Sequence, residues 1–390
     1  MGSRRRKLSV ERLGGTFPSR IIKVRYFQLA SCIVALLLAD CSEPTVSPPS
    51  SASAAVLRPT SKLARATGTT LYVLNFASDA NVTVYNGDDG SLERTVEPPS
   101  GTGFIDISSD SKKHLFASVF PIGGKLHDPG VLNAYSDSGA TLVQQLHQHH
   151  AFMAPIVDSS EDLFAGCAAK NVCEYQGTKG KQTVRQNLIR QIKVGKILPL
   201  EDGRVFLVSD TGQFGVNTGS GVDVYDPGSE SPNWIVQPQT VDGITAAAFD
   251  SKGDLYLAFP CVTVSSGEVD EYPPGSKYPT RVLKANDGVG CPAQLAFDGS
   301  DNLYVLSGGF TDSVIVYNPN SSQPIRVLTQ GILKPRALFM AVDHKGDVFV
   351  SNSSYYSDPG SVVVYGPSGT TPSATITEGI ENPRELAIGD

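Results

Sequence analysis

Hydrophobic and polar residues along the chain repeat in units of similar length. In each unit an aliphatic residue, two further residues and a tyrosine precede a turn, as in VTVYNGDDG and VIVYNPNSS. Apolar and polar residues alternate within each copy, which is typical of a strand, and Asn, Asp, Gly or Pro then supply turn geometry. The six intervals between the first and last of these tyrosines cover 280 residues, so the mean period is close to 47. The seven tyrosines are Tyr85, Tyr135, Tyr175, Tyr225, Tyr272, Tyr317 and Tyr365.

Each tyrosine segment is flanked by further apolar segments. An apolar run that ends in Asp and a tight turn comes first in most units, as in MAVDHKGD, and a segment such as IRVLT comes last. Each unit therefore predicts four short antiparallel strands in a meander. The predicted second strands are LYVLN (71–75), LFASV (115–119), LFAGC (163–167), VFLVS (205–209), LYLAF (255–259), LYVLS (303–307) and VFVSN (348–352).

Seven units of four strands predict an all-β fold, a seven-bladed β-propeller. A single four-stranded sheet cannot bury both of its faces, so such blades stack around a channel. The C-terminal LAIGD (386–390) has the pattern of a first strand, and the unit at Leu71 begins with its second strand. We therefore expect the C-terminal strand to join the N-terminal blade and close the ring, which removes a free sheet edge. A two-sheet sandwich does not explain a sevenfold repeat.

The repeat resembles two known kinds of propeller repeat. LYVLN with the following VTVY is similar to the bacterial repeats named for a Tyr-Val-Thr-Asn (YVTN) signature, and LAFDGSDNLYV resembles NHL-type repeats. The resemblance covers residues 70–390. It implies a β-propeller and a function among those of such proteins, which include scaffold and binding proteins, sugar-lactone hydrolases and a lyase that opens a cyclic antibiotic. Fold resemblance alone does not choose between these functions.

The N-terminal residues predict export. Residues 1–25 hold eight Lys or Arg and one Glu, and an apolar run of 13 residues follows, FQLASCIVALLLA (27–39). This run is short for a membrane span and suits a signal peptide. Leu38-Ala39-Asp40-Cys41 resembles a bacterial lipoprotein box, which implies lipidation of Cys41, although Asp40 departs from the small residue of that pattern. A cleaved secreted protein and an uncleaved anchor are the alternatives. We assign 1–40 to the signal peptide, 41–69 to a flexible Ser/Pro-rich tether and 70–390 to the propeller.

Binding sites of propellers usually lie on the face that holds the loops between second and third strands and between blades. We call this the loop-rich face. The loops between blades here have the form Gly-x-x-x-Pro, in which glycine frees the backbone to turn. Four copies are Gly195 to Pro199, Gly288 to Pro292, Gly331 to Pro335 and Gly379 to Pro383.

Histidines gather in LHQHHA (146–151), at the end of an outer strand that runs into such a loop. On a strand His147 and His149 project to one side, so they are candidate ligands of a divalent metal. His127 or Asp128, in another loop of the same unit, is the candidate third ligand. The alternative, solvated histidines at an exposed strand end, is favoured because outer strands lie far from the channel. We place His114 and His344 at the surface, in turns on the opposite face.

Four cysteines lie in the domain predicted to be exported, where disulfides form. Cys167 and Cys173 fall on neighbouring strands, and Cys261 and Cys291 fall in loops of the loop-rich face. We expect disulfides between Cys167 and Cys173 and between Cys261 and Cys291. Free buried thiols and thiolate metal ligands are the alternatives.

Acidic residues recur where first strands end. We interpret Asp106, Asp158, Asp250, Asp298 and Asp343 as turn formers, because a catalytic carboxylate is expected once and not in every repeat.

The sequence thus predicts an exported cell-envelope propeller that binds a protein, glycan or small ligand at its loop-rich face. It is lipid-anchored, or otherwise periplasmic or secreted, and we expect a monomer. Net charge is −7, and since residues 1–25 contribute +7 the remainder carries −14, which gives no reason to expect binding to nucleic acid. The alternative is a metal-dependent propeller enzyme of the lactonase or lyase type.

Overall fold

The computed structural model describes most of the repeat region. Contacts divide the chain into two units, residues 1–50 and 51–390, and the described residues all belong to the second. They are 68–76, 80–122, 130–136, 138–148, 153–157, 163–168, 171–178, 181–189, 196–199, 205–208, 222–225, 234–236, 244–261, 267–284, 287–308, 312–333, 337–353 and 359–389.

The described residues contain strands and no α-helix. In chain order the strands are β1 (Thr70–Asn75), β2 (Val82–Asn86), β3 (Leu92–Val96), β4 (Thr102–Ser109), β5 (Leu115–Pro121), β6 (Gly130–Ser136), β7 (Thr141–Gln148), β8 (Met153–Val157), β9 (Leu163–Ala168), β10 (Asn171–Thr178), β11 (Lys181–Ile189), β12 (Lys196–Pro199), β13 (Val205–Val208), β14 (Val222–Tyr225), β15 (Trp234–Val236), β16 (Ala246–Phe249), β17 (Leu255–Phe259), β18 (Glu268–Tyr272), β19 (Arg281–Lys284), β20 (Pro292–Phe297), β21 (Leu303–Ser307), β22 (Ser313–Tyr317), β23 (Pro324–Leu328), β24 (Ala337–Val342), β25 (Val348–Asn352), β26 (Ser361–Tyr365), β27 (Ala374–Ile376) and β28 (Pro383–Gly389).

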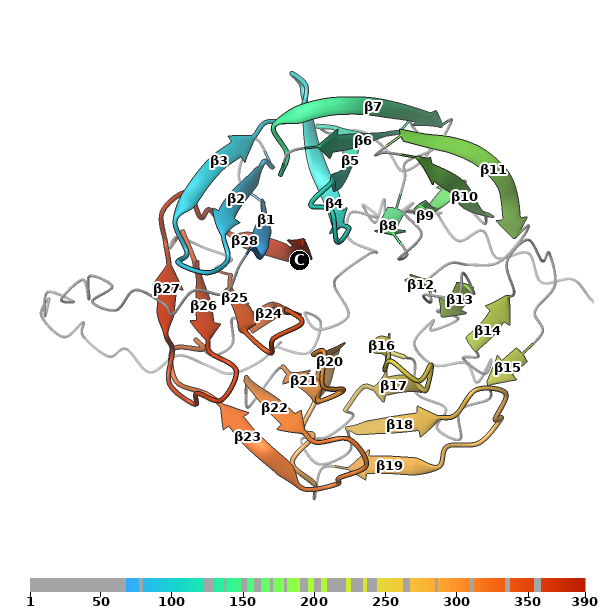
Figure 1. Cartoon of the computed structure of the whole chain (residues 1–390), viewed down its shortest axis with the longest axis vertical. Helices are drawn as coiled ribbons and strands as arrows, with labels where there is room; N and C mark the ends of the chain where they lie inside the picture. The colour runs from blue at the N-terminus through green and yellow to red at the C-terminus, as the bar shows by residue number, and fades with distance from the viewer. Residues whose placement is uncertain are drawn as a thin grey trace, which may run out of the picture. The chain divides into compact units, whose positions relative to one another are not determined.

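These strands form four-stranded antiparallel sheets, as the repeat predicts (Figure 1). Six sheets contain four strands that are consecutive in the sequence, from β4–β7 to β24–β27. A seventh contains β28, β1, β2 and β3, in that order. In it the C-terminal strand lies beside the first strand of the described chain, and Leu71 is opposite Ile388.

The hydrophobic core lies between neighbouring sheets. One cluster joins Tyr304 and Val316 of β21 and β22 to Met340 and Tyr365 of the next sheet. Equivalent clusters join other sheet pairs, including one between the β24–β27 sheet and the sheet of β1. The first strands also contact one another in sequence: β28 contacts β4, which contacts β8, and so on through β12, β16, β20 and β24, which contacts β28. Each sheet therefore has apolar surface that its neighbours cover.

The repeated tyrosines are core residues, and three of them also hold the loops between sheets. Six of the seven are buried, and the side chain of Tyr225 lies outside the described residues. The Tyr85 hydroxyl donates to the carbonyl of Glu378 at 2.6 Å, and Tyr317 donates to that of Asp287 at 2.7 Å. Tyr365 donates in the same way to Gln330. Each accepting residue directly precedes the glycine of a Gly-x-x-x-Pro loop, and these glycines have positive φ, +72° at Gly379, +93° at Gly288 and +82° at Gly331.

The recurring aspartates are turn formers, with one correction. Oδ1 of Asp343 accepts the backbone N–H groups of Lys345 and Asp347, at 3.0 and 2.8 Å. Asp250 and Asp298 make the same pair of bonds, which confirms their predicted role.

The prediction for Asp106 was wrong. Asp106 lies inside β4, which runs on to Ser109, and Asp110 forms the turn by accepting the N–H groups of Lys112 and His114. Asp158 lies outside the described residues.

Outer-strand arginines form a further link between sheets. The Arg326 guanidinium lies 5.7 Å from the ring centroid of Tyr304 on its own sheet. It donates to the carbonyls of Gly366 and Gly369 on the next sheet, at 3.0 and 3.1 Å. Arg281 packs on Tyr256 in the same way. Arginine suits this position because its planar head stacks on an aromatic face while its N–H groups donate outward.

Replacing a repeat tyrosine by phenylalanine isolates the hydroxyl link. We expect Tyr317→Phe to lower the free energy of unfolding by about 1 kcal/mol, since the ring stays packed and one buried hydrogen bond is lost. Urea denaturation measures this. Tyr278→Phe, at an exposed tyrosine, is the control and should change nothing. Equal stability of the Tyr317 variant and the parent would contradict a stabilising role for the bond.

Candidate functional site

Asparagines that end second strands shape the loop end of two sheets. Asn75, at the end of β1, is buried and donates from Nδ2 to Thr83 Oγ1 and to the Gly379 carbonyl, both at 3.1 Å. Its Oδ1 accepts the N–H of Glu381 at 3.0 Å. One amide side chain thus holds the loop between β27 and β28.

Asn352, at the end of β25, does the same for the loop between β23 and β24. Its Nδ2 donates to the Gly331 carbonyl at 3.0 Å, and its Oδ1 accepts the N–H of Leu333 at 2.9 Å. The final asparagine of LYVLN and VFVSN therefore has a definite structural role, which the sequence pattern did not reveal. The Asn352 amide satisfies backbone groups of the loop, in which Ile332 is buried and Leu333 is exposed.

Three large apolar side chains are exposed in loops at this end of the sheets. They are Phe76 after β1, Ile122 after β5 and Leu333 before β24, with exposed fractions of 48%, 63% and 47%. A single exposed apolar residue is ordinary, but the same end of three sheets carries one each.

Phe76 is the most constrained of the three. Its N–H lies 3.2 and 3.1 Å from the carbonyls of Glu381 and Asn382, in the loop that precedes β28. The Arg384 guanidinium lies 4.6 Å from the centre of the Phe76 ring. A half-exposed aromatic ring held against an arginine offers a ligand an apolar surface that is already fixed in place. The residues are 308 positions apart in the sequence, so no local pattern indicates the pair.

The disulfide between Cys261 and Cys291 is present, as predicted. It joins Cys261, two residues after the end of β17, to the residue before β20, with Cα atoms 5.1 Å apart. The Cys291 N–H also donates to Ser307 Oγ at 3.0 Å. The disulfide therefore ties together the loop ends of two neighbouring sheets.

The other predicted cysteine pair stays a prediction. Cys167 and Cys173 lie on β9 and β10, which are paired strands, with Cys173 opposite Ala165. Their side chains lie outside the described residues, and so does Cys41.

The predicted metal ligands are not brought together by anything that the structure describes. His147 lies near the end of β7 and is exposed. His149, His127 and Asp128 lie outside the described residues. Among the residues that are described, no group of three or more His, Cys, Asp or Glu side chains is arranged to hold a metal ion.

His114 differs from its predicted place at the surface. Its side chain is only 13% exposed, and Nδ1 lies 2.6 Å from Oδ2 of Asp110. It completes the turn that Asp110 forms. His344, in the equivalent turn of a later sheet, is exposed as expected.

One buried carboxyl group resembles a catalytic one in its pKa but not in its position. Burial, together with the nearby Glu268, raises the pKa of Asp270 to about 7. The Tyr272 hydroxyl donates to it at 3.0 Å. Asp270 lies between Leu257 and Val282 in the middle of a sheet and is 1% exposed, so a substrate cannot reach it. Structural residues can have perturbed pKa values as well.

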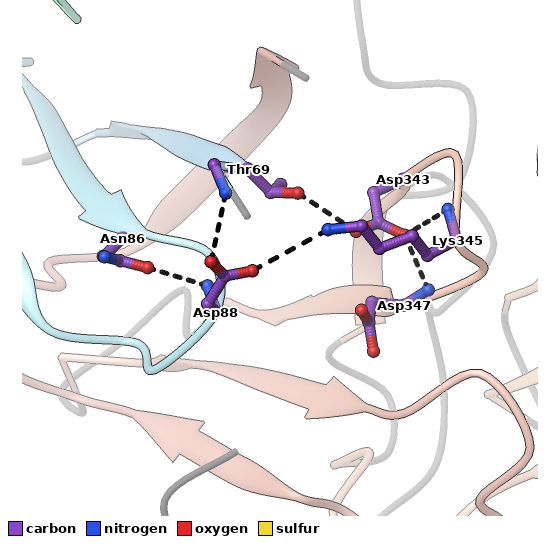
Figure 2. A network of polar contacts seen from close by, with 7 residues as sticks. Thr69, Asn86, Asp88, Asp343, Lys345 and Asp347 are labelled. Atoms are coloured by element: carbon purple, nitrogen blue, oxygen red, sulfur yellow. Dashed lines mark hydrogen bonds and ion pairs between the residues drawn. The ribbon is translucent and has the colours of Figure 1, made fainter. Parts of the chain in front are cut away.

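A polar network joins the turn between β24 and β25 to the residues around β1 and β2 (Figure 2). Thr69 Oγ1 donates to Asp343 Oδ2 at 3.2 Å. Lys345 Nζ lies 4.0 Å from Oδ1 of Asp88, and Oδ2 of Asp88 accepts the Gly68 N–H at 3.2 Å. The network therefore connects segments from the two ends of the described chain.

Asp347 occupies a position in this network where the β20–β23 sheet has the side-chain donor Asn302 and the β16–β19 sheet has Asp254. The Asp347 N–H donates to Asp343, as that of Asn302 donates to Asp298. Asn302 also donates from its side chain to Asp298 at 2.8 Å, which an ionised Asp347 cannot do for Asp343. Burial and the Asp343 carboxylate raise the pKa of Asp347 to about 6.

Solved structures resemble this chain in fold. A protein from Lactobacillus plantarum aligns with a TM-score of 0.59 at 13% identity, over 83% of this chain and 99% of that one. A quinoprotein alcohol dehydrogenase-like protein from Bacteroides thetaiotaomicron aligns with a TM-score of 0.55 at 9% identity, over 81% and 77%. Dihydro-heme d1 dehydrogenase NirN, in complex with DHE, aligns with a TM-score of 0.54 at 11% identity, over 81% and 74%.

These neighbours are β-propeller-like proteins. At such low identity the likeness shows the fold alone. No protein-family model and no curated protein sequence matches the chain. Within the described residues, no helix is long and apolar enough to span a membrane.

The disulfide can be tested by replacing both of its cysteines. We expect Cys261→Ser with Cys291→Ser to lower the free energy of unfolding by about 3 kcal/mol, because the bond closes a loop of 30 residues in the unfolded chain. Urea denaturation with and without a reductant measures the loss. Reduction of the parent should cost at least as much. A parent protein that reduction leaves unchanged would contradict the stabilising role, and a further loss on reducing the double variant would indicate the Cys167–Cys173 bond.

The raised pKa of Asp347 predicts a pH-dependent stability. A carboxyl whose pKa is higher when folded than the ordinary value of 3.8 destabilises the fold progressively as pH rises from about 4 to about 6. Asp347→Asn removes this effect, so we expect it to raise the melting temperature at pH 8 and to change it little at about pH 3.5, below the pH range in which the effect develops. Glu93→Gln, at an exposed carboxylate, is the control. An equal effect of Asp347→Asn at both pH values would contradict the pKa assignment.

Proposed function

We propose that residues 70–390 form a closed seven-bladed β-propeller of the YVTN/NHL-like type that binds a ligand at its loop-rich face. The seven described sheets support the blade number. The contacts between successive first strands, which return from β24 to β28 and then to β4, support closure. The pairing of β28 with β1 supports it further.

The observation that carries the binding function is the Phe76–Arg384 pair. Aromatic residues and arginine contribute most of the energy in many binding interfaces, particularly when the protein holds them in place before the ligand arrives. Phe76 is fixed through its backbone and Arg384 through its position on β28. Ile122, in the corresponding loop of the next sheet, is a second exposed apolar side chain at this end. The ligand is a protein, glycan or small molecule that places an apolar face on Phe76.

The protein acts outside the cytoplasm in this proposal. Residues 1–40 are the signal peptide, Cys41 carries the lipid and residues 41–69 are the tether. The Cys261–Cys291 disulfide supports an oxidising compartment. If Cys41 is not lipidated, the same domain is periplasmic or secreted.

The alternative is a metal-dependent enzyme of the lactonase or lyase type. It depends on His147, His149 and a ligand from His127 or Asp128, and of these only His147 is described. Since no described observation favours it, binding is the better supported function. Metal content of the purified protein distinguishes the two.

Removing the Phe76 ring tests the binding function. Thermal-shift screening of cello-, chito- and xylo-oligosaccharides and of short acidic, basic and neutral peptides identifies a ligand, and titration calorimetry gives its affinity. We expect Phe76→Ala to weaken that affinity at least about tenfold, because a central aromatic anchor is lost.

Tyr278→Ala is the matched control, since it removes an exposed aromatic ring from the turn between β18 and β19. Its affinity should equal that of the parent. A ligand that binds the Phe76 variant and the parent equally would place the site elsewhere.

A further inference from the structure

The last strand of each sheet pairs on one side only, and among the described side chains of these strands β23 has the most exposed large apolar ones. β23 pairs with β22 and with no other described strand. Its Ile325 and Val327 point to the same side and are 48% and 47% exposed. An exposed edge with apolar side chains is a place where another strand can add.

Two equivalent strands, β3 and β27, are protected at the same positions. Arg326 of β23 is opposite Val316, just as Arg94 of β3 is opposite Val84 and Ala374 of β27 is opposite Val364. The residues that flank these positions are therefore equivalent. They are Glu93 and Thr95 in β3, Ser373 and Thr375 in β27, and Ile325 and Val327 in β23. Charged and polar side chains at strand edges oppose unwanted pairing, so β23 lacks a protection that β3 and β27 have.

The net charge of the chain indicates which kind of strand can pair with β23. The chain beyond residue 25 carries −14, so two copies repel unless they meet at a neutral surface. The stretch 318–333 holds one charged residue, Arg326. Its guanidinium is already engaged with Gly366, Gly369 and the Tyr304 hydroxyl. The edge is thus a neutral, aliphatic surface on an acidic protein, and the complement of such an edge is another neutral, aliphatic edge.

We propose that two copies of this chain associate through antiparallel pairing of their β23 strands. A two-fold axis at Arg326 places Ile325 of each copy opposite Val327 of the other, which makes two identical apolar cross-strand pairs. All four side chains gather on one face of a continuous sheet. The proposal is independent of the ligand at the loop-rich face and departs from the expected monomer.

The size of the contact sets the strength of the dimer. Five residues in each strand bury far less than the roughly 1,200 Å² of a stable interface, so association is weak. We expect a reversible dimer with a dissociation constant on the order of 100 µM, which forms at high local concentration.

Sedimentation velocity between low micromolar and millimolar concentrations tests the proposal. The parent protein should shift from monomer to dimer, and Ile325→Lys and Val327→Glu should each remain monomeric. Thr375→Glu, at the equivalent position of β27, should dimerise like the parent. Thermal melting verifies that every variant is folded. A parent that stays monomeric throughout, or variants that dimerise like the parent, would overturn the proposal.

Mixing the two β23 variants tests the register. In the proposed pairing the lysine of the Ile325→Lys copy lies opposite the glutamate of the Val327→Glu copy, so the mixture should form a heterodimer although neither variant self-associates. A mixture that remains monomeric would overturn the two-fold arrangement. A parent that stays monomeric but binds a neutral extended peptide would show that the edge accepts a foreign strand and not a second copy.

Discussion

The structure depends on one constraint: each four-stranded sheet has apolar surface on both faces, and only neighbouring sheets can cover it. The clusters that join Tyr304 to Met340, and Leu71 to Phe349, show this packing between sheets. Hydrophobic burial is not directional, so further contacts set the orientation of each sheet. The repeated tyrosines, turn aspartates and outer-strand arginines provide these contacts, because their polar atoms bond to specific backbone groups. Packing therefore stabilises the sheets against one another, and hydrogen bonds set the orientation of each sheet.

The same contacts explain why the loop end of the sheets is suited to binding. Backbone groups in a loop between sheets require partners when they are partly buried, and Asn75 and Asn352 supply them from inside. Some side chains of these loops are therefore left at the surface, although Ile332 and Ile380 are buried in the core. Phe76 can remain half exposed beside Arg384, and a disulfide can fix the loop end between β17 and β20. A rigid scaffold with variable loop side chains is how repeat folds acquire different ligands.

Much of the fold could be predicted from the sequence, because the repeat contains the same local pattern several times. The strand pattern located all seven second strands, and the Cys261–Cys291 pair followed from the loops that hold the two residues. The second unit has two aspartates before its second strand, Asp106 and Asp110, and the turn former is Asp110. Asp250, Asp298 and Asp343 each stand five residues before a second strand, and in the second unit that spacing selects Asp110. The spacing was visible in the sequence, but β4 extends past Asp106 through an irregular pairing that the pattern does not encode.

The strands, their order within a unit, the turn chemistry and one disulfide can be predicted from the amino-acid sequence, because each depends on short-range periodicity or on residue type. Which distant groups meet depends on how the sheets pack. Arg384 reaches Phe76, Thr69 reaches Asp343, and the tyrosine hydroxyls reach carbonyls of the preceding loop because adjacent sheets bring together residues that no local pattern relates. Packing also leaves Ile325 and Val327 exposed, whereas the alternating residues of inner strands are covered. Alternation specifies two faces of a strand, and only packing determines which face another sheet covers.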